Sequence, residues 1–237
     1  MGKILKNIIL TILFLFLITS TALLTYLHFF ASDDKDVSGT WTAKLDKTNQ
    51  AAVTALGWLQ DIEAVTISLE DMETYMQDLT IEVHLTLEQT AHSEGTFYCN
   101  VLPESYEACN QAAYEAFAVA FEELLIERLC MAGYTGGTDK ETMEALVTET
   151  FGMSTVPYLM TCGPNLLPSL EELQAQYDGS GTYQAAQGIL TRQFDDGEMV
   201  PAKMEFYIRK GSSLILSEEN DFTHSAVIYT LQQSQNK

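Results

Sequence analysis

The sequence predicts an α+β protein with an antiparallel β-sheet, a helical insertion and one N-terminal transmembrane helix. Three observations support this fold class. A charge-free apolar segment opens the chain, segments with alternating apolar residues lie near both ends of the remainder, and a region rich in Ala, Glu, Phe and Leu separates them. We therefore expect an anchor or signal segment over residues 1–31, a linker over 32–38 and one domain over 39–237.

The apolar segment over residues 8–30 is long enough to cross a membrane. A helix of this length spans about 34 Å, against a hydrocarbon core of about 30 Å. Lys3 and Lys6 precede it and acidic residues follow it, so the positive-inside rule places the N-terminus in the cytoplasm and the domain outside the cell membrane. The alternative is a signal peptide cleaved after Ala22, which leaves a secreted product.

The rest of the chain is strongly acidic. The protein has 33 Asp and Glu residues against 12 Lys and Arg, a formal net charge of -21, and every acidic residue follows the apolar segment. Binding to a phosphate backbone requires basic side chains. The composition therefore excludes nucleic acid as a partner.

The domain is expected to begin near Gly39 with a strand. Residues 39–46 alternate apolar and polar side chains, which is the period of a half-buried strand with Trp41 toward the core. Apolar residues then recur at helical spacing over residues 48–60 and predict a short helix, although Gly and Thr weaken it.

A β-hairpin is predicted next. Residues 79–88 place aliphatic side chains on one face and Thr, Glu and His side chains on the other. Turn residues follow over 90–95, and residues 96–101 return to a β-rich composition. The two segments should pair with one face buried and one face in water.

Residues 103–177 are expected to form the helical insertion. Pro103 opens a long run of helix-forming residues that ends before Gly133, and proline is tolerated in a first helical turn. Capping boxes that begin at Thr138 and Ser169 predict two further helices. The turn-rich stretch between these two has room for one short helix.

Strand character returns after the insertion. Short β-rich segments alternate with turn signals and complete an antiparallel meander. The predicted strands are residues 182–186, 189–192, 204–209, 213–217 and 226–231.

Short motifs along the domain give the chain a family resemblance. They are Gly39 and Trp41, Gly95-Thr-Phe-Tyr98, Gly181-Thr-Tyr183 and Ser213-Leu-Ile-Leu216. With the acidic helical middle, they make residues 38–233 resemble a group of uncharacterised, membrane-anchored extracytoplasmic proteins of Gram-positive bacteria with a lipocalin-like sheet. The resemblance implies that the Trp41 indole packs across the closed end of a barrel as a structural lid and does not touch ligand.

The exported part contains four cysteines, Cys99, Cys109, Cys130 and Cys162. Two disulfides with three connectivities are open to them outside the cytoplasm. Cys99 and Cys109 are the favoured local pair, whereas Cys109 and Cys130 lie about 31 Å apart on one predicted helix, too far to bond. Four buried free thiols are the alternative.

The sequence offers no catalytic or metal-binding constellation. His84 is expected on a wet strand face, and His92 and His224 in turns; no Gly-x-Ser-x-Gly elbow, phosphate loop, Cys-x-x-Cys or His-x-x-x-His spacing occurs. Three acidic loops offer oxygen ligands for Ca²⁺ without the spacing of an EF-hand, which favours solvated charge clusters. These loops are residues 33–36, 195–198 and 218–221. We expect no cofactor and no metal.

An aromatic stripe on the long helix is expected to pack against the sheet, with an aromatic ligand box as the alternative. The stripe consists of Tyr106, Tyr114, Phe117, Phe121 and Leu125.

The expected function is a non-enzymatic, membrane-tethered extracytoplasmic module that binds a small apolar ligand or a cell-envelope protein. The alternatives are a cell-envelope hydrolase with a dispersed site and a purely structural or sensory surface domain. An open apolar cavity favours the binder, and a polar cleft with two convergent titratable side chains favours the enzyme. A filled barrel favours the structural domain.

Overall fold

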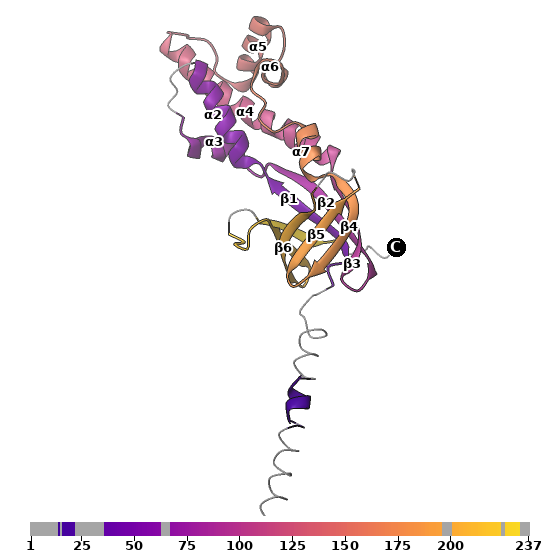
Figure 1. The fold of residues 1–237 in the computed structure, drawn as a ribbon. Helices are drawn as coiled ribbons and strands as arrows, with labels where there is room; N and C mark the ends of the chain where they lie inside the picture. Colours follow the sequence, from indigo (N-terminus) through magenta and orange to yellow (C-terminus); the bar gives the residue numbers. More distant parts are fainter. Residues whose placement is uncertain are drawn as a thin grey trace, which may run out of the picture.

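The structure is a computed structural model that describes residues 14, 16–21, 36–62, 67–195, 201–223 and 226–232. Antiparallel strands close into a barrel in chain order, with β8 hydrogen-bonded to β1 (Figure 1). They are β1 Gly39–Asp46, β2 Thr80–Ala91, β3 Glu94–Val101, β4 Gly179–Ala186, β5 Ile189–Phe194, β6 Lys203–Lys210, β7 Ser213–Ser217 and β8 Val227–Leu231. This barrel confirms the predicted α+β class with an antiparallel sheet.

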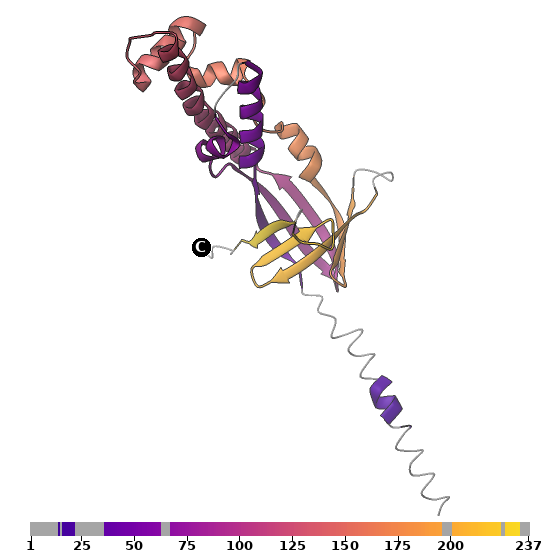
Figure 2. The ribbon, with the colours of Figure 1, turned by 90° about the vertical axis from the view of Figure 1, so that its left-hand side faces the viewer.

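The helices of the domain gather at one end of the barrel and extend away from it (Figures 1 and 2). They come from two insertions. The connection from β1 to β2 holds α2 Thr48–Ile62 and α3 Leu69–Tyr75, and the connection from β3 to β4 holds α4 Pro103–Met131, α5 Lys140–Phe151, α6 Thr155–Cys162 and α7 Leu170–Tyr177. The predicted insertion is present, and α3 was not expected.

Two capping boxes show why α7 was predicted and how α3 is built. At α7 the Ser169 N–H donates to the Glu172 carboxylate at 2.8 Å, and the Glu172 N–H donates to the Ser169 hydroxyl at 3.2 Å. Ser68 and Asp71 form the same reciprocal pair at the start of α3. The shorter acidic side chain of Asp71 serves here in place of the usual Glu.

The start of α5 corrects one detail of the sequence analysis. Its N-cap is Asp139, whose carboxylate accepts a hydrogen bond from the Thr142 N–H at 3.0 Å, and not Thr138. A carboxylate is favoured at this position because it also interacts with the positive end of the helix dipole.

The alternating pattern of β2 is confirmed. Ile81, Val83, Leu85 and Leu87 are at most 1% exposed and face the core, while the residues between them are half-buried. Trp41 of β1 lies opposite Leu85 in the register. Side chains that point inward from neighbouring strands therefore fill this part of the barrel interior, as expected for a small barrel.

The end of the barrel away from the helices is closed by tight turns, and we call it the turn end. Gln187 and Gly188 between β4 and β5 both have positive φ, 55° and 77°, as two-residue type I′ hairpins require. Short turns also join β2 to β3 and β6 to β7. The connections at the opposite, helical end are all longer.

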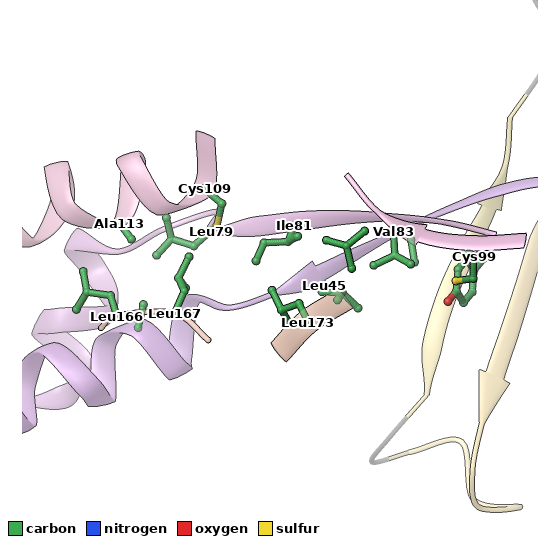
Figure 3. Close-up of a cluster of buried hydrophobic side chains, with 14 of the residues drawn as sticks. Leu45, Leu79, Ile81, Val83, Cys99, Cys109, Ala113, Leu166, Leu167 and Leu173 are labelled. Carbon is green, nitrogen blue, oxygen red and sulfur yellow. The ribbon is translucent and has the colours of Figure 1, made fainter. Parts of the chain in front are cut away.

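The barrel shares one hydrophobic core with α2, α3, α4, α6 and α7, whereas the buried Met143 and Val147 of α5 lie outside it. Figure 3 shows buried side chains that run from Ala113 and Leu166 among the helices, past Leu79 and Ile81, to Cys99 inside the barrel. Because no break separates the two parts, the helical insertion is packed as part of the barrel domain.

Trp41 lies fully buried near the turn end. Its indole N–H donates to the Val37 carbonyl oxygen at 2.9 Å, and the Arg209 guanidinium lies 5.4 Å from the ring centre. A cation over the face of an indole is attracted by the ring electrons. These contacts hold the start of β1 against the barrel wall.

The predicted membrane segment falls largely outside the described residues. Residues 14 and 16–21 are helical, and the rest of residues 1–31 is not described. Among the helices that the structure does describe, none combines the length and the apolar character needed to cross a bilayer.

Candidate functional site

A cavity of about 250 Å³ lies where α7 meets the helical end of the barrel. We call it the mouth cavity. Strands β3, β5, β6, β7 and β8 contribute to its wall, and α7 contributes Gln176 and Tyr177. Its lining combines charged and phenolic side chains with aliphatic ones, so it is not the open apolar cavity that the sequence analysis associated with a binder.

A buried ion pair forms part of the cavity wall. Arg192 of β5 donates from Nε and from Nη2 to Glu205 Oε2 of β6, at 2.9 and 2.7 Å. Their side chains are 6% and 7% exposed. The two residues lie two positions apart in the β5–β6 register and so share the inner face of the barrel.

The ion pair continues outward to the rim of the cavity. Lys203 Nζ lies 3.5 Å from Glu205 Oε1 and 3.1 Å from Glu218 Oε1. Glu218 is 68% exposed, so the chain of alternating charges ends in solvent. Only its inner pair bears the full cost of burial, because ions at the rim remain hydrated.

Two aromatic rings hold the Arg192 side chain in place. Its guanidinium carbon lies 5.3 Å from the ring centre of Phe97 and 5.8 Å from that of Phe194. These two rings contact each other edge to face, with centres 5.1 Å apart. Rings and carboxylate together fix the plane of the guanidinium.

The remaining titratable groups at the cavity are uncharged. Burial raises the pKa of the Cys99 thiol to about 11, although the nearby Arg192 acts in the opposite direction. Burial also raises the pKa of the Tyr229 and Tyr177 hydroxyls. All three groups are therefore protonated at neutral pH.

Tyr229 is the most deeply buried phenol that lines the cavity. Its side chain is 3% exposed and points inward from β8. No residue that the structure describes forms a hydrogen bond with its hydroxyl, which lies at the cavity. A buried phenol normally has a partner for its O–H.

The cysteines lie in two different surroundings. Cys99 and Cys109 are buried, Cys130 and Cys162 are exposed, and all four are free thiols in the structure. Cys99 faces the barrel interior, whereas Cys109 lies on α4 beside Leu79 (Figure 3). The favoured Cys99–Cys109 bridge is therefore not formed here.

The predicted histidine and acidic positions do not converge. His84 lies on β2 beside the Gln232 amide, His92 lies in a turn that borders a cavity of about 100 Å³ at the turn end, and His224 falls outside the described residues. Loops 33–36 and 195–198 are described only in part, and within the described residues no three His, Cys, Asp or Glu side chains gather as metal ligands.

The aromatic stripe of α4 packs mostly between helices, which corrects the expectation that it covers the sheet. Phe117 and Phe121 contact Trp58 of α2, with ring centres 5.7 and 6.4 Å apart. Phe121 also contacts Tyr158 of α6. The reason is that only the first part of α4 lies over the barrel, while the rest projects beyond it (Figure 2).

A second buried acidic group lies in the helical block, defined here as α2 to α7. Glu122 of α4 is 9% exposed and lies 2.8 Å from the hydroxyl of Thr155, which also contacts the carboxyl of Glu144. One hydroxyl proton cannot be donated fully to both carboxyl groups, so the arrangement favours the protonated form of the more buried Glu122. Burial raises the pKa of Glu122, whereas the hydrogen bonds of Thr155 lower the pKa of Glu144.

Sequence reasoning missed the ion pair and Tyr229. A signal was present, since Arg192 and Glu205 occupy positions of the same parity as the buried Leu190 and Tyr207 in their strands. A charged residue at a strand position that alternation assigns to the buried face is expected to point inward.

Comparison of the chain with protein-family models, with curated proteins and with solved structures finds no match.

Proposed function

We propose that the protein is a membrane-tethered extracytoplasmic binding module whose ligand site is the mouth cavity. The supporting observation is the Tyr229 hydroxyl, which borders the cavity and forms no hydrogen bond with the described residues. The residue is largely buried, but its hydroxyl is open to the cavity. A ligand with an acceptor atom can therefore accept its hydrogen bond.

The size and lining of the cavity define the ligand class. At about 250 Å³ the cavity is smaller than the roughly 300–1,000 Å³ of sites for drug-sized molecules. Leu216 and Val227 provide apolar wall, and Arg192 and Tyr229 provide polar contacts. The ligand is therefore small and combines a polar group with a limited apolar part, because polar side chains form most of the lining.

The topology suits a tethered receptor. The strand β1, which follows the N-terminal segment, starts at the turn end, and the mouth cavity lies at the helical end. If residues 8–30 form the anchor, the cavity lies on the side of the barrel away from the attachment point. The anchor then does not obstruct the access of soluble ligands to the mouth cavity.

Binding fits the chemistry of the cavity better than hydrolysis. A nucleophile needs a lowered pKa or an adjacent base. The Cys99 thiol has a raised pKa, and no histidine is present among the described residues that line the cavity. Glu205 is already held by Arg192 and Lys203.

Native mass spectrometry of the full chain, purified in detergent from its own host, tests the proposal. We expect extra mass that is lost on denaturation and is reduced in Tyr229→Phe. Tyr98→Phe is the matched control, because Tyr98 is 57% exposed on the barrel exterior. A clean apo mass for the wild type, or equal ligand occupancy in Tyr229→Phe, contradicts the proposal.

A further inference from the structure

The inner wall of the mouth cavity has more unused hydrogen-bond donors than unused acceptors. Arg192 has five N–H groups, and Nε and Nη2 each direct one at Glu205. The other N–H groups, on Nη1 and Nη2, have no oxygen acceptor among the described residues, although the Cys99 sulfur is a weak partner of the guanidinium. The Tyr229 hydroxyl is one further donor without an acceptor among these residues.

The carboxylate acceptors of the cavity are already engaged. Glu205 Oε2 lies within reach of Nε and Nη2 of Arg192, and Glu205 Oε1 lies near Lys203. Glu218 pairs with Lys203 at the exposed rim, where the exposed Gln176 amide also lies. Among the described residues, the inner cavity therefore presents N–H and O–H donors without an oxygen acceptor.

We propose that the mouth cavity binds the carboxylate of a small monocarboxylic acid, which accepts hydrogen bonds from Arg192 and Tyr229. This inference rests on the proposed function and names its ligand class. A carboxylate matches the fork of a guanidinium and offers lone pairs for the phenol at the same time. Arg192 and Lys203 balance Glu205 and Glu218 in the cavity wall, so the ligand contributes the one unbalanced charge and is held by the unused N–H groups of Arg192.

A singly charged ligand fits better than a phosphate. Glu205 and Glu218 remain in the cavity wall, and the chain carries a net charge of -21. A second negative charge on the ligand adds repulsion without adding a free cation, because Lys203 already bridges both carboxylates.

The apolar part of the wall determines the chemistry of the ligand beyond its carboxylate. Phe194, Leu216 and Val227 border the cavity. Apolar ligand surface is driven against such side chains by the hydrophobic effect. A compact aryl or branched alkyl carboxylate therefore uses both parts of the cavity.

Ligand-observed NMR titration of the full chain with benzoate and with benzamide tests the inference. The two probes have nearly the same shape and differ in charge. We expect benzoate to bind at least tenfold more tightly than benzamide, and Tyr229→Phe to weaken benzoate at least fivefold. Tyr98→Phe should leave both affinities unchanged.

Three outcomes contradict the inference and separate it from the proposed function. Equal or tighter binding of benzamide at a Tyr229-dependent site removes the carboxylate and keeps the binding module. Benzoate binding that is unaffected by Tyr229→Phe places the anion elsewhere. Absence of binding by both probes, with a clean apo native mass, removes both the inference and the proposed function.

Discussion

The barrel and the helical block each bury a carboxyl group, and they neutralise it in different ways. Glu205 is 6% exposed and is paired with the guanidinium of Arg192. Glu122 is 9% exposed, lies on the same Thr155 hydroxyl as Glu144, and has a pKa that burial raises toward the neutral form. Neutralisation by a permanent cation persists across the physiological pH range, whereas neutralisation by a proton depends on pH.

The difference links each region to a different property. The ion pair leaves a fixed, oriented guanidinium with unused donors, which suits recognition of a ligand. The carboxyl pair joins α4, α5 and α6 through Thr155, and because the pKa of Glu122 is raised, the stability of this outer part of the helical block should depend on pH.

The largest effect is expected from removal of the cation in the barrel. Arg192→Met leaves Glu205 buried beside Lys203 alone, and breaking a buried pair costs about 3–5 kcal/mol. Chemical denaturation of the full chain in detergent should show this loss. The double variant Arg192→Met with Glu205→Gln should recover a large part of it, and a loss below about 1 kcal/mol in the single variant contradicts the account.

A smaller effect is expected when the helical cluster loses its hydroxyl. Thr155→Val keeps the shape of the side chain but removes the group that contacts Glu122 and Glu144. Glu122 then loses its hydroxyl partner, while Glu144 keeps the backbone N–H of residue 155, and we expect a loss of about 1–3 kcal/mol. Hydrogen exchange should show the loss in α5 and α6, and faster exchange in the barrel strands instead argues against it.

The smallest effect is a change in pH dependence. The raised pKa of Glu122 stabilises the fold below the unfolded pKa of about 4.3, and this contribution is lost as pH rises through the folded pKa. The lowered pKa of Glu144 acts oppositely, and its contribution is lost as pH falls through its own folded value. Above the unfolded pKa, the change of the free energy of unfolding with pH therefore comes mainly from Glu122.

Glu122→Gln isolates this effect, because the amide resembles the protonated acid. Its melting temperature relative to the wild type should rise between pH 5 and pH 8, by an amount that corresponds to about 1 kcal/mol. Glu107→Gln on the same helix is the control for net charge, because Glu107 is exposed. A pH-independent difference shows that Glu122 is ionised throughout and contradicts the raised pKa of Glu122.

The sequence predicts local structure well where the signal lies within a single helix or strand. The alternation of β2, the proline at the start of α4 and the Ser169 box of α7 each correspond to an observed element. The same box at Ser68 went unnoticed, although its residues are as informative.

The candidate site depends on contacts that no local pattern specifies. The alternating pattern shows which residues lie on the same face of a strand. That face becomes the barrel interior only because the barrel closes. The Arg192–Glu205 pair depends on the β5–β6 register, and Tyr229 reaches the cavity because β8 returns to β1. The Glu122–Glu144 contact likewise requires α5 and α6 to fold back on α4.

A crystal structure of the protein purified from its own host tests the central claim most directly. We expect density in the mouth cavity for a small molecule that accepts hydrogen bonds from Tyr229 and Arg192. A cavity that is filled by protein side chains, with the Tyr229 hydroxyl bonded to the chain itself, contradicts a ligand site in the barrel.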